Sequence, residues 1–149
     1  MLFSVAVSAA LASFGLQGVQ AGRVETVTIN DLTINKVGSP VGTTIPSISF
    51  ILDLEDSSNF ECTANDLSWP ESSDIIACSD PSYSFLLWPG EKTEFGVMIY
   101  HDVGDAKADL RGGVDVDTEC DNSGGSGPAD ELCTQKASIT FTIDGPVGN

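Results

Sequence analysis

Four acidic residues at every second position form the sequence pattern most suited to binding chemistry: Asp115, Asp117, Glu119 and Asp121. On a β-strand, residues two apart share a face, so this spacing predicts one acidic face. Carboxylates this close together attract a cation or a basic surface. The pattern fits a solvated strand face, a docking surface for a basic partner, or a loosely built Ca²⁺ site. An EF-hand loop is excluded, because Cys120 and Ser126 occupy the positions that require Gly and Glu.

His101 is the one histidine of the sequence, and it lies between Tyr100 and Asp102. A catalytic dyad or triad needs only one histidine, but a Ser-His-Asp site also needs a serine on a tight turn, and no G-x-S-x-G motif occurs. Paired carboxylates at glycosidase spacing carry no signal among 22 Asp and Glu residues. The sequence therefore predicts a surface histidine, no enzymatic activity and no cofactor.

The four cysteines fall into two groups that are close in sequence, Cys62 with Cys78 and Cys120 with Cys133. In an oxidising compartment four cysteines imply two disulfides, for which three pairings exist. The spacing favours the two local pairs, each closing a loop of roughly 12 to 15 residues and stabilising the fold by about 3 kcal/mol. A zinc site is the competing interpretation, but it would require CxxC-like pairs, and neither spacing provides one.

The first residues of the chain predict export. The stretch from Leu2 to Leu16 is apolar or small and uncharged, and Val19-Gln20-Ala21 has the small residues that signal peptidase requires. About 15 apolar residues are fewer than the roughly 20 that span a bilayer. We expect residues 1–21 to be a signal peptide and residues 22–149 to form a single extracellular domain.

Composition narrows the range of partners. The chain has 149 residues, and its Asp and Glu outnumber its Lys and Arg by 22 to 6, giving a formal net charge of −16. Nucleic acids and anionic membrane surfaces both require basic residues, so neither is an expected partner. The hydrophobic fraction of 41% is typical of one globular domain.

Apolar and polar residues alternate along several segments, which indicates that β-strands position the acidic residues, the histidine and the cysteines. The clearest runs are Ile48 to Leu54, Phe95 to Ile99 and Ile139 to Ile143, and turn residues separate them. Such punctuated strands predict an all-β fold, a compact antiparallel β-barrel or sandwich.

Three other segments give more specific expectations about local structure. Val27–Ile29 and Leu32–Ile34 predict two strands separated by Asn30-Asp31, and Tyr83 to Trp88 predicts a more buried strand. Pro128 to Leu132 is compatible with one short helical turn, with Pro at its first position.

The second cysteine loop has a distinctive sequence. It runs from Cys120 to Cys133 as Cys-Asp-Asn-Ser-Gly-Gly-Ser-Gly-Pro-Ala-Asp-Glu-Leu-Cys, and Gln135 follows. The Gly-Gly-x-Gly-Pro-x-Asp core, the closing cysteine and the following glutamine resemble a signature of the fungal secreted proteins related to the major Alternaria allergen. The segment from Cys62 to Cys78 also fits, and the resemblance covers most of residues 24–143.

This resemblance implies a compact β-barrel with disulfides Cys62–Cys78 and Cys120–Cys133, and a secreted fungal protein without enzymatic activity. Relatives in this family act as allergens, elicitors of plant defence or virulence effectors. Some bind plant pathogenesis-related proteins of the thaumatin-like class, and the type member carries flavonoid-like ligands. The type member also has a cysteine near its mature N-terminus that links a dimer. Residues 22–31 contain no cysteine here, so a covalent dimer is not expected.

Three functions follow from these observations. The first is a secreted effector or elicitor that binds extracellular plant defence proteins, with the row from Asp115 to Asp121 attracting a basic partner. The second is a carrier of a small aromatic, flavonoid-like ligand, held in the barrel or at a dimer seam. The third is a structural protein of the cell wall or spore surface.

Overall fold

The computed structural model describes residues 23–104, 109–122 and 130–145, and the predicted signal peptide lies outside them. Strands and turns make up this part of the chain, and none of its residues belong to a helix long and apolar enough to cross a membrane. The strands are β1 (Val24–Ser39), β2 (Gly42–Leu54), β3 (Asn59–Trp69), β4 (Ile76–Ala77), β5 (Tyr83–Pro89), β6 (Phe95–His101), β7 (Leu110–Val116), β8 (Thr118–Asp121), β9 (Asp130–Gln135) and β10 (Ile139–Asp144).

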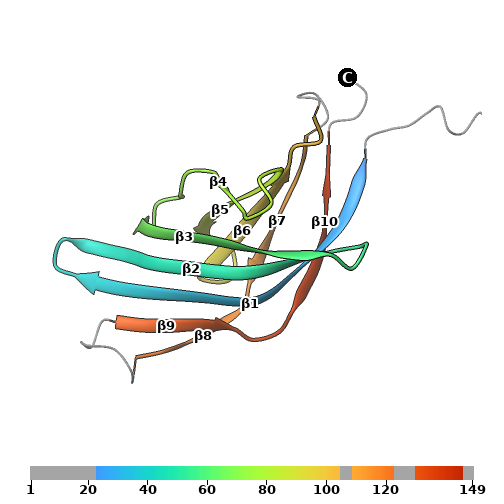
Figure 1. The fold of residues 1–149 in the computed structure, drawn as a ribbon. Helices are drawn as coiled ribbons and strands as arrows, with labels where there is room; N and C mark the ends of the chain where they lie inside the picture. Colours follow the sequence, from blue (N-terminus) through green and yellow to red (C-terminus); the bar gives the residue numbers. More distant parts are fainter. Residues whose placement is uncertain (1–22, 105–108, 123–129, 146–149) are drawn as a thin grey trace, which may run out of the picture.

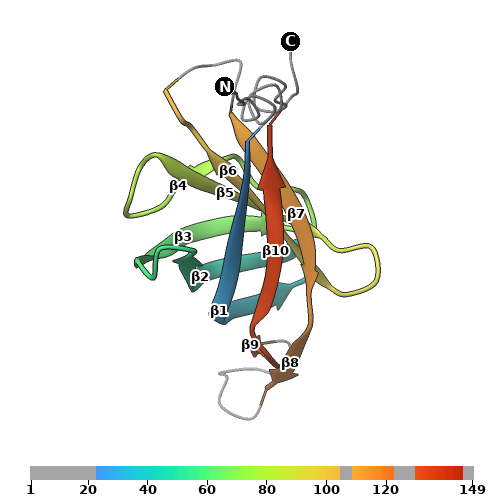
Figure 2. The same ribbon diagram turned by 90° about the vertical axis from the view of Figure 1, so that its right-hand side faces the viewer.

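All strand pairs are antiparallel, and they form one sheet in the order β3-β2-β1-β10-β7-β6-β5-β4, with β9 joining β1 to β8. The sheet curls round into a nearly closed barrel (Figures 1 and 2). The predicted all-β antiparallel fold is confirmed, and its form is the barrel. Turns or loops lie at three of the predicted punctuating segments, Gly38-Ser39-Pro40, Asp80-Pro81-Ser82 and Pro89-Gly90, but Gly112-Gly113 was wrongly predicted as a turn, because both residues pair with β6 within β7.

β1 pairs with β2 over most of its length and changes its other neighbour half-way along. Residues 24–29 pair with β10, and residues 33–37 pair with β9. Between them the register with β2 shifts, and Asp31 adopts a positive φ of 57°. The expectation of two separate strands here was therefore wrong. Asn30-Asp31 forms a bulge within one long strand, because β2 pairs on both sides of it.

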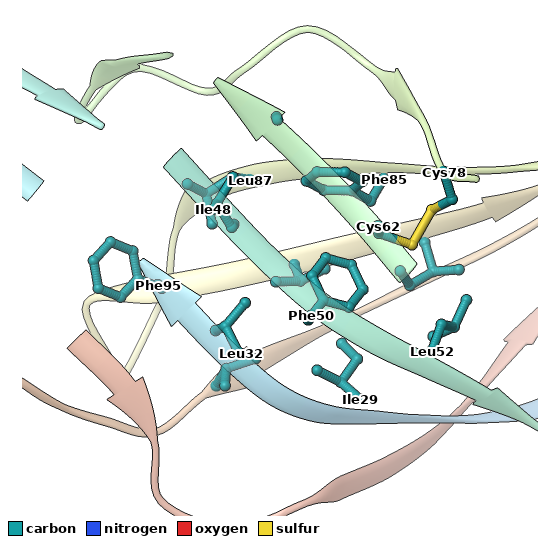
Figure 3. Close-up of a cluster of buried hydrophobic side chains, with 14 of the residues drawn as sticks. Ile29, Leu32, Ile48, Phe50, Leu52, Cys62, Cys78, Phe85, Leu87 and Phe95 are labelled. Atoms are coloured by element: carbon teal, nitrogen blue, oxygen red, sulfur yellow. A yellow bond between two sulfur atoms is a disulfide. The ribbon is translucent and has the colours of Figure 1, made fainter. Parts of the chain in front are cut away.

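Large side chains fill the barrel interior (Figure 3). Phe50 of β2 and Phe85 of β5 meet edge to face, with ring centroids 5.0 Å apart. The predicted inward positions are confirmed on β6, and on β2 for Ile48, Phe50 and Leu52, which are fully buried, whereas Leu54 is half-buried. On β10 only Ile143 is fully buried. β5 is a more buried strand, as expected: every residue from Tyr83 to Trp88 is buried or half-buried, with Leu86 and Trp88 on its outer side.

A disulfide closes the seam between the two ends of the sheet. Cys62 of β3 is bonded to Cys78, which follows β4, and Ser79 N donates to Glu61 O at 2.9 Å beside it. The second disulfide, Cys120–Cys133, joins directly opposed residues of β8 and β9. Both local pairings are confirmed, and the zinc alternative is excluded because all four sulfur atoms are in disulfides.

The expected helical turn from Pro128 to Leu132 was wrong for its described part. β9 begins at Asp130, and Glu131 and Leu132 pair with β1. Pairing with β1 on one side and β8 on the other determines the conformation of this segment. Pro128 and Ala129 lie outside the described residues.

Candidate functional site

The structure divides the predicted acidic row. Asp115, at the end of β7, is half-buried and accepts hydrogen bonds from the backbone N–H groups of Glu91 (3.0 Å) and Lys92 (2.7 Å). It therefore fixes the loop between β5 and β6 onto β7. A carboxylate satisfied by two backbone donors is held in place and is less available to a partner. The four acids do not share one strand, because Asp115 lies on β7, Asp117 between β7 and β8, and Glu119 and Asp121 on β8.

The other three acids remain on the surface. Asp117 lies between β7 and β8, and its backbone carbonyl accepts from Lys136 N at 3.0 Å. Glu119 and Asp121 alternate with the disulfide-bonded Cys120 along β8, and all three acids are exposed. We call Asp117, Glu119 and Asp121 the acidic β8 face. The disulfide holds its strand to β9, so the backbone that presents these carboxylates is fixed.

Lys36 of β1 neutralises two acidic side chains, Glu94 of the β5–β6 loop and Glu131 of β9. Its Nζ pairs with Glu94, and with Oε1 of Glu131 at 2.9 Å, and it lies 5.9 Å from the centroid of the Phe95 ring. Burial lowers the pKa of Lys36, but the hydrogen bonds and charges of Glu94 and Glu131 outweigh burial and raise the pKa above its ordinary value. These two carboxylates are thus balanced internally by Lys36.

One group of metal-ligand types occurs among the described residues, formed by Glu94, Cys120 and Cys133. Both sulfur atoms belong to a disulfide, and a metal-binding cysteine must be a free thiolate. The Glu94 carboxylate is also in an ion pair with Lys36. The group is therefore a structural junction between the β5–β6 loop and the β8–β9 hairpin, and its chemistry does not suit a metal.

His101 belongs to a hydrogen-bonded cluster, so the prediction of a surface histidine was wrong. Its Nδ1 lies 2.9 Å from both carboxylate oxygens of Glu25, and its side chain is 15% exposed. Tyr83 donates its hydroxyl to Glu25 Oε1 at 2.9 Å and stacks on the His101 ring, with centroids 3.9 Å apart. Glu25 lies on β1, so the cluster joins the N-terminal strand to the β5–β6 hairpin. Sequence reasoning missed it because Glu25 is 58 and 76 positions from its partners.

We expect the Tyr83 hydroxyl to make stability depend on alkaline pH. Burial, and then the hydrogen bond to Glu25, raise the pKa of Tyr83 well above its ordinary value of 10.0. The unfolded chain ionises first, so stability is complete below pH about 10 and falls above it by up to about 1.4 kcal/mol per pH unit. Urea unfolding of Tyr83→Phe between pH 8 and 11 should show a flatter decline than the unmodified protein. Tyr100→Phe, on the outer face of β6, is the control and should keep the full decline.

Basic residues are absent from a long part of the sequence. From Val37 to Glu91 the chain contains no Lys, Arg or His, but it contains several Asp and Glu. We call this the cation-free segment. It forms the end of β1 and the whole of β2, β3, β4 and β5, which lie on both sides of the barrel seam. Acidic groups at the seam therefore have no basic neighbour within their own strands.

A groove with a volume of about 530 Å³ lies on the outer face of β5, β6 and β7. Trp88 and Met98 form its apolar wall, and Asp115 lies at its charged end. A Cβ at Gly96 would lie 2.6 Å from Trp88 Nε1, so the missing side chain lets the indole lie close against the sheet.

Comparison with known proteins identifies the family. The effector protein PevD1 of Verticillium dahliae is 31% identical over 145 residues, which are 96% of this chain and 88% of that protein. This protein belongs to the PevD1 family. The same likeness is found with PevD1 of Verticillium dahliae strain VdLs.17. No family model matches the chain.

Comparison of this chain with solved structures identifies a known fold. A crystal structure of the Alternaria alternata allergen Alt a 1 matches with a TM-score of 0.61 and 19% identity, over 79% of this chain and 86% of that one. A second Alt a 1 structure matches with a TM-score of 0.61 and 18% identity, over 83% and 96%. The predicted resemblance to the Alternaria allergen is confirmed for the fold, and the likeness to PevD1 makes the protein effector-like.

Proposed function

We propose that this protein is a secreted fungal effector that binds a basic extracellular defence protein of a plant host through the acidic β8 face. The observation that carries the proposal is the exposure of Asp117, Glu119 and Asp121 on a disulfide-fixed hairpin of a chain with a net charge of −16. The effector relative PevD1 supports the class of function. Two disulfides and no free cysteine suit an oxidising compartment outside the cell.

A partner of the thaumatin-like class is the one that the sequence resemblance favours, and a basic surface on it would supply the required complementarity. Opposite charges steer diffusing partners together and raise the association rate, and salt screens this effect over about 8 Å at physiological ionic strength. The proposal therefore predicts an association rate that falls as salt rises. Asp115 is left out of the binding surface, because its carboxylate holds the β5–β6 loop.

The test replaces the acidic β8 face without changing its shape. In the triple variant Asp117→Asn, Glu119→Gln and Asp121→Asn, association with a purified basic thaumatin-like protein should be about tenfold slower at low salt. The dependence of the rate on salt should also be flatter. Stopped-flow or surface-binding kinetics at several salt concentrations measure both.

A matched control separates local charge from total charge. The variant Asp31→Asn, Glu55→Gln and Asp109→Asn removes the same three charges from exposed positions outside β8. It should keep most of the original association rate. If the two triple variants slow association equally, the acidic β8 face has no special role, and if neither does, charge steering itself is absent.

A further inference from the structure

β3 ends the main strand order of the sheet, so it has β2 on one side and no strand on the other. On that free side, the backbone bonding found in the described residues is the bond from Ser79 N to Glu61 O at 2.9 Å. The Cys62–Cys78 disulfide holds the same end of the strand. Past Cys62, β3 continues to Trp69 and stays paired with β2 on its other side. Figure 1 shows β3 beside β2.

Antiparallel pairing determines which backbone groups are open on this side. In such a ladder, the N–H and C=O of one residue point toward the partner strand, and those of the next residue point away. Glu61 directs its carbonyl away from β2, so Thr63 and Asn65 also direct both groups away from β2. Both residues are exposed, and no described residue bonds these backbone groups. Asp66, with a φ of 57°, ends the regular stretch.

This edge lacks two common protections against strand addition. Edge strands are often blocked by Lys or Pro, and residues 59–69 contain neither. Four backbone groups on Thr63 and Asn65 are thus available to an extended peptide. So short a ladder needs a second source of affinity, which the surrounding charge supplies.

Every charged side chain on the strands that form the β3 edge is acidic. β3 lies within the cation-free segment, and Glu61, Asp66 and Asp74 are exposed beside the seam. A peptide with Lys or Arg would gain favourable contacts with these acids. A second copy of this chain would instead bring another cation-free edge and another net charge of −16, so self-pairing of β3 is opposed by repulsion.

We propose that the β3 edge, Thr63 to Asn65, receives an extended Lys- or Arg-bearing segment of a partner protein as an added strand. Backbone hydrogen bonds supply the ladder, and the acids of the cation-free segment select a basic sequence. This surface is separate from the acidic β8 face, and the inference stands without it.

The probe is an eight-residue peptide of alternating Val and Lys with blocked ends. We expect it to bind the intact, disulfide-bonded protein and to slow hydrogen exchange at the Thr63 and Asn65 amides at least tenfold, measured by NMR. The same peptide with every backbone amide N-methylated keeps its charge but has no N–H to donate to the ladder from either edge. It should bind about tenfold more weakly, because backbone pairing is lost.

A proline on β3 tests the same contact from the protein side. Thr63→Pro removes an outward N–H and leaves the β2 ladder intact, so it should weaken binding of the alternating peptide about tenfold. Thr63→Ala keeps the N–H and is the matched control, with affinity close to the original. If Thr63→Pro does not fold, the exchange rates and the N-methylated peptide decide the matter in the unmodified protein.

Several results would overturn the inference. Equal binding of the two peptides, or unchanged exchange at Thr63 and Asn65, would show attraction by charge without an added strand. A dimer that Thr63→Pro abolishes would show that a second copy occupies the edge. The triple variant of the acidic β8 face should keep the difference between the two peptides, so failure of the proposed function leaves this result readable.

Discussion

Replacing Cys62 and Cys78 together with alanine is expected to lower the free energy of unfolding by about 4 kcal/mol, the largest effect of any change to this barrel. The bond restrains 16 residues of the unfolded chain, and in the folded state it joins β3 to the segment after β4. Among the described residues, the backbone hydrogen bond between these two ends of the sheet is the one from Ser79 N to Glu61 O. Urea unfolding of the double variant, followed by tryptophan fluorescence, measures the loss. The seam should open as well, and faster hydrogen exchange at Ser79 N would report it.

The second disulfide provides the control. Cys120 and Cys133 enclose 13 residues, so the restraint on the unfolded chain is nearly the same. These residues are already opposed in the β8–β9 ladder, and replacing them with alanine should cost only about 2 kcal/mol. Equal losses for the two double variants would contradict the idea that Cys62–Cys78 has a special role in closing the barrel.

Gln135→Ala is expected to destabilise the protein by about 3 kcal/mol, a large effect for one polar side chain. The Gln135 amide completes the bulge in β1: its Oε1 accepts from Leu32 N at 3.0 Å, and its Nε2 donates to Ile29 O at 2.9 Å and to Ala137 O at 2.7 Å. Alanine leaves these backbone groups unpaired where β1 changes neighbour from β10 to β9. Equilibrium urea unfolding measures the change.

Gln135→Glu tests the same hydrogen bonds through the dependence of stability on pH. The charged carboxylate cannot donate to the carbonyls of Ile29 and Ala137, but the protonated form can donate one bond. The variant should therefore lose stability as pH rises through the ordinary glutamate pKa of about 4.3, and regain part of it below. Asn35→Ala removes an exposed bond to Ser47 and should cost under about 1 kcal/mol. A comparable loss for both alanine variants would show that Gln135 has no special role.

Local patterns predicted the strands whose buried side chains are large. Phe95, Val97 and Ile99 alternate with polar or small residues, and all three are fully buried on β6. β3 gave no such signal, because its fully buried or nearly buried residues are Cys62 and Ala64, which are small. A strand that contributes little volume to the core leaves little trace in a hydrophobic pattern.

The sites were harder to predict than the strands, since each depends on residues far apart in the chain. Asp115 looks like one of four equivalent acids in the sequence, but a loop 23 to 24 positions earlier supplies donors to its carboxylate. The acidic residue types alone predicted a solvated face here. Glu119 and Asp121, the acidic residues of β8, are indeed exposed. Pairing across the sheet, rather than composition, decides which acids are used internally.

The position of β1 also determines when the barrel can form. Val24 pairs with Asp144 and Ile29 with Ile139, so β1 completes its ladder only with a strand 110 to 120 positions later in the chain. Until β9 and β10 have been synthesised, β1 has only β2 beside it. Folds dominated by such distant contacts take milliseconds to seconds to form. Closure of the barrel is therefore a late and slow step, because it waits for β10.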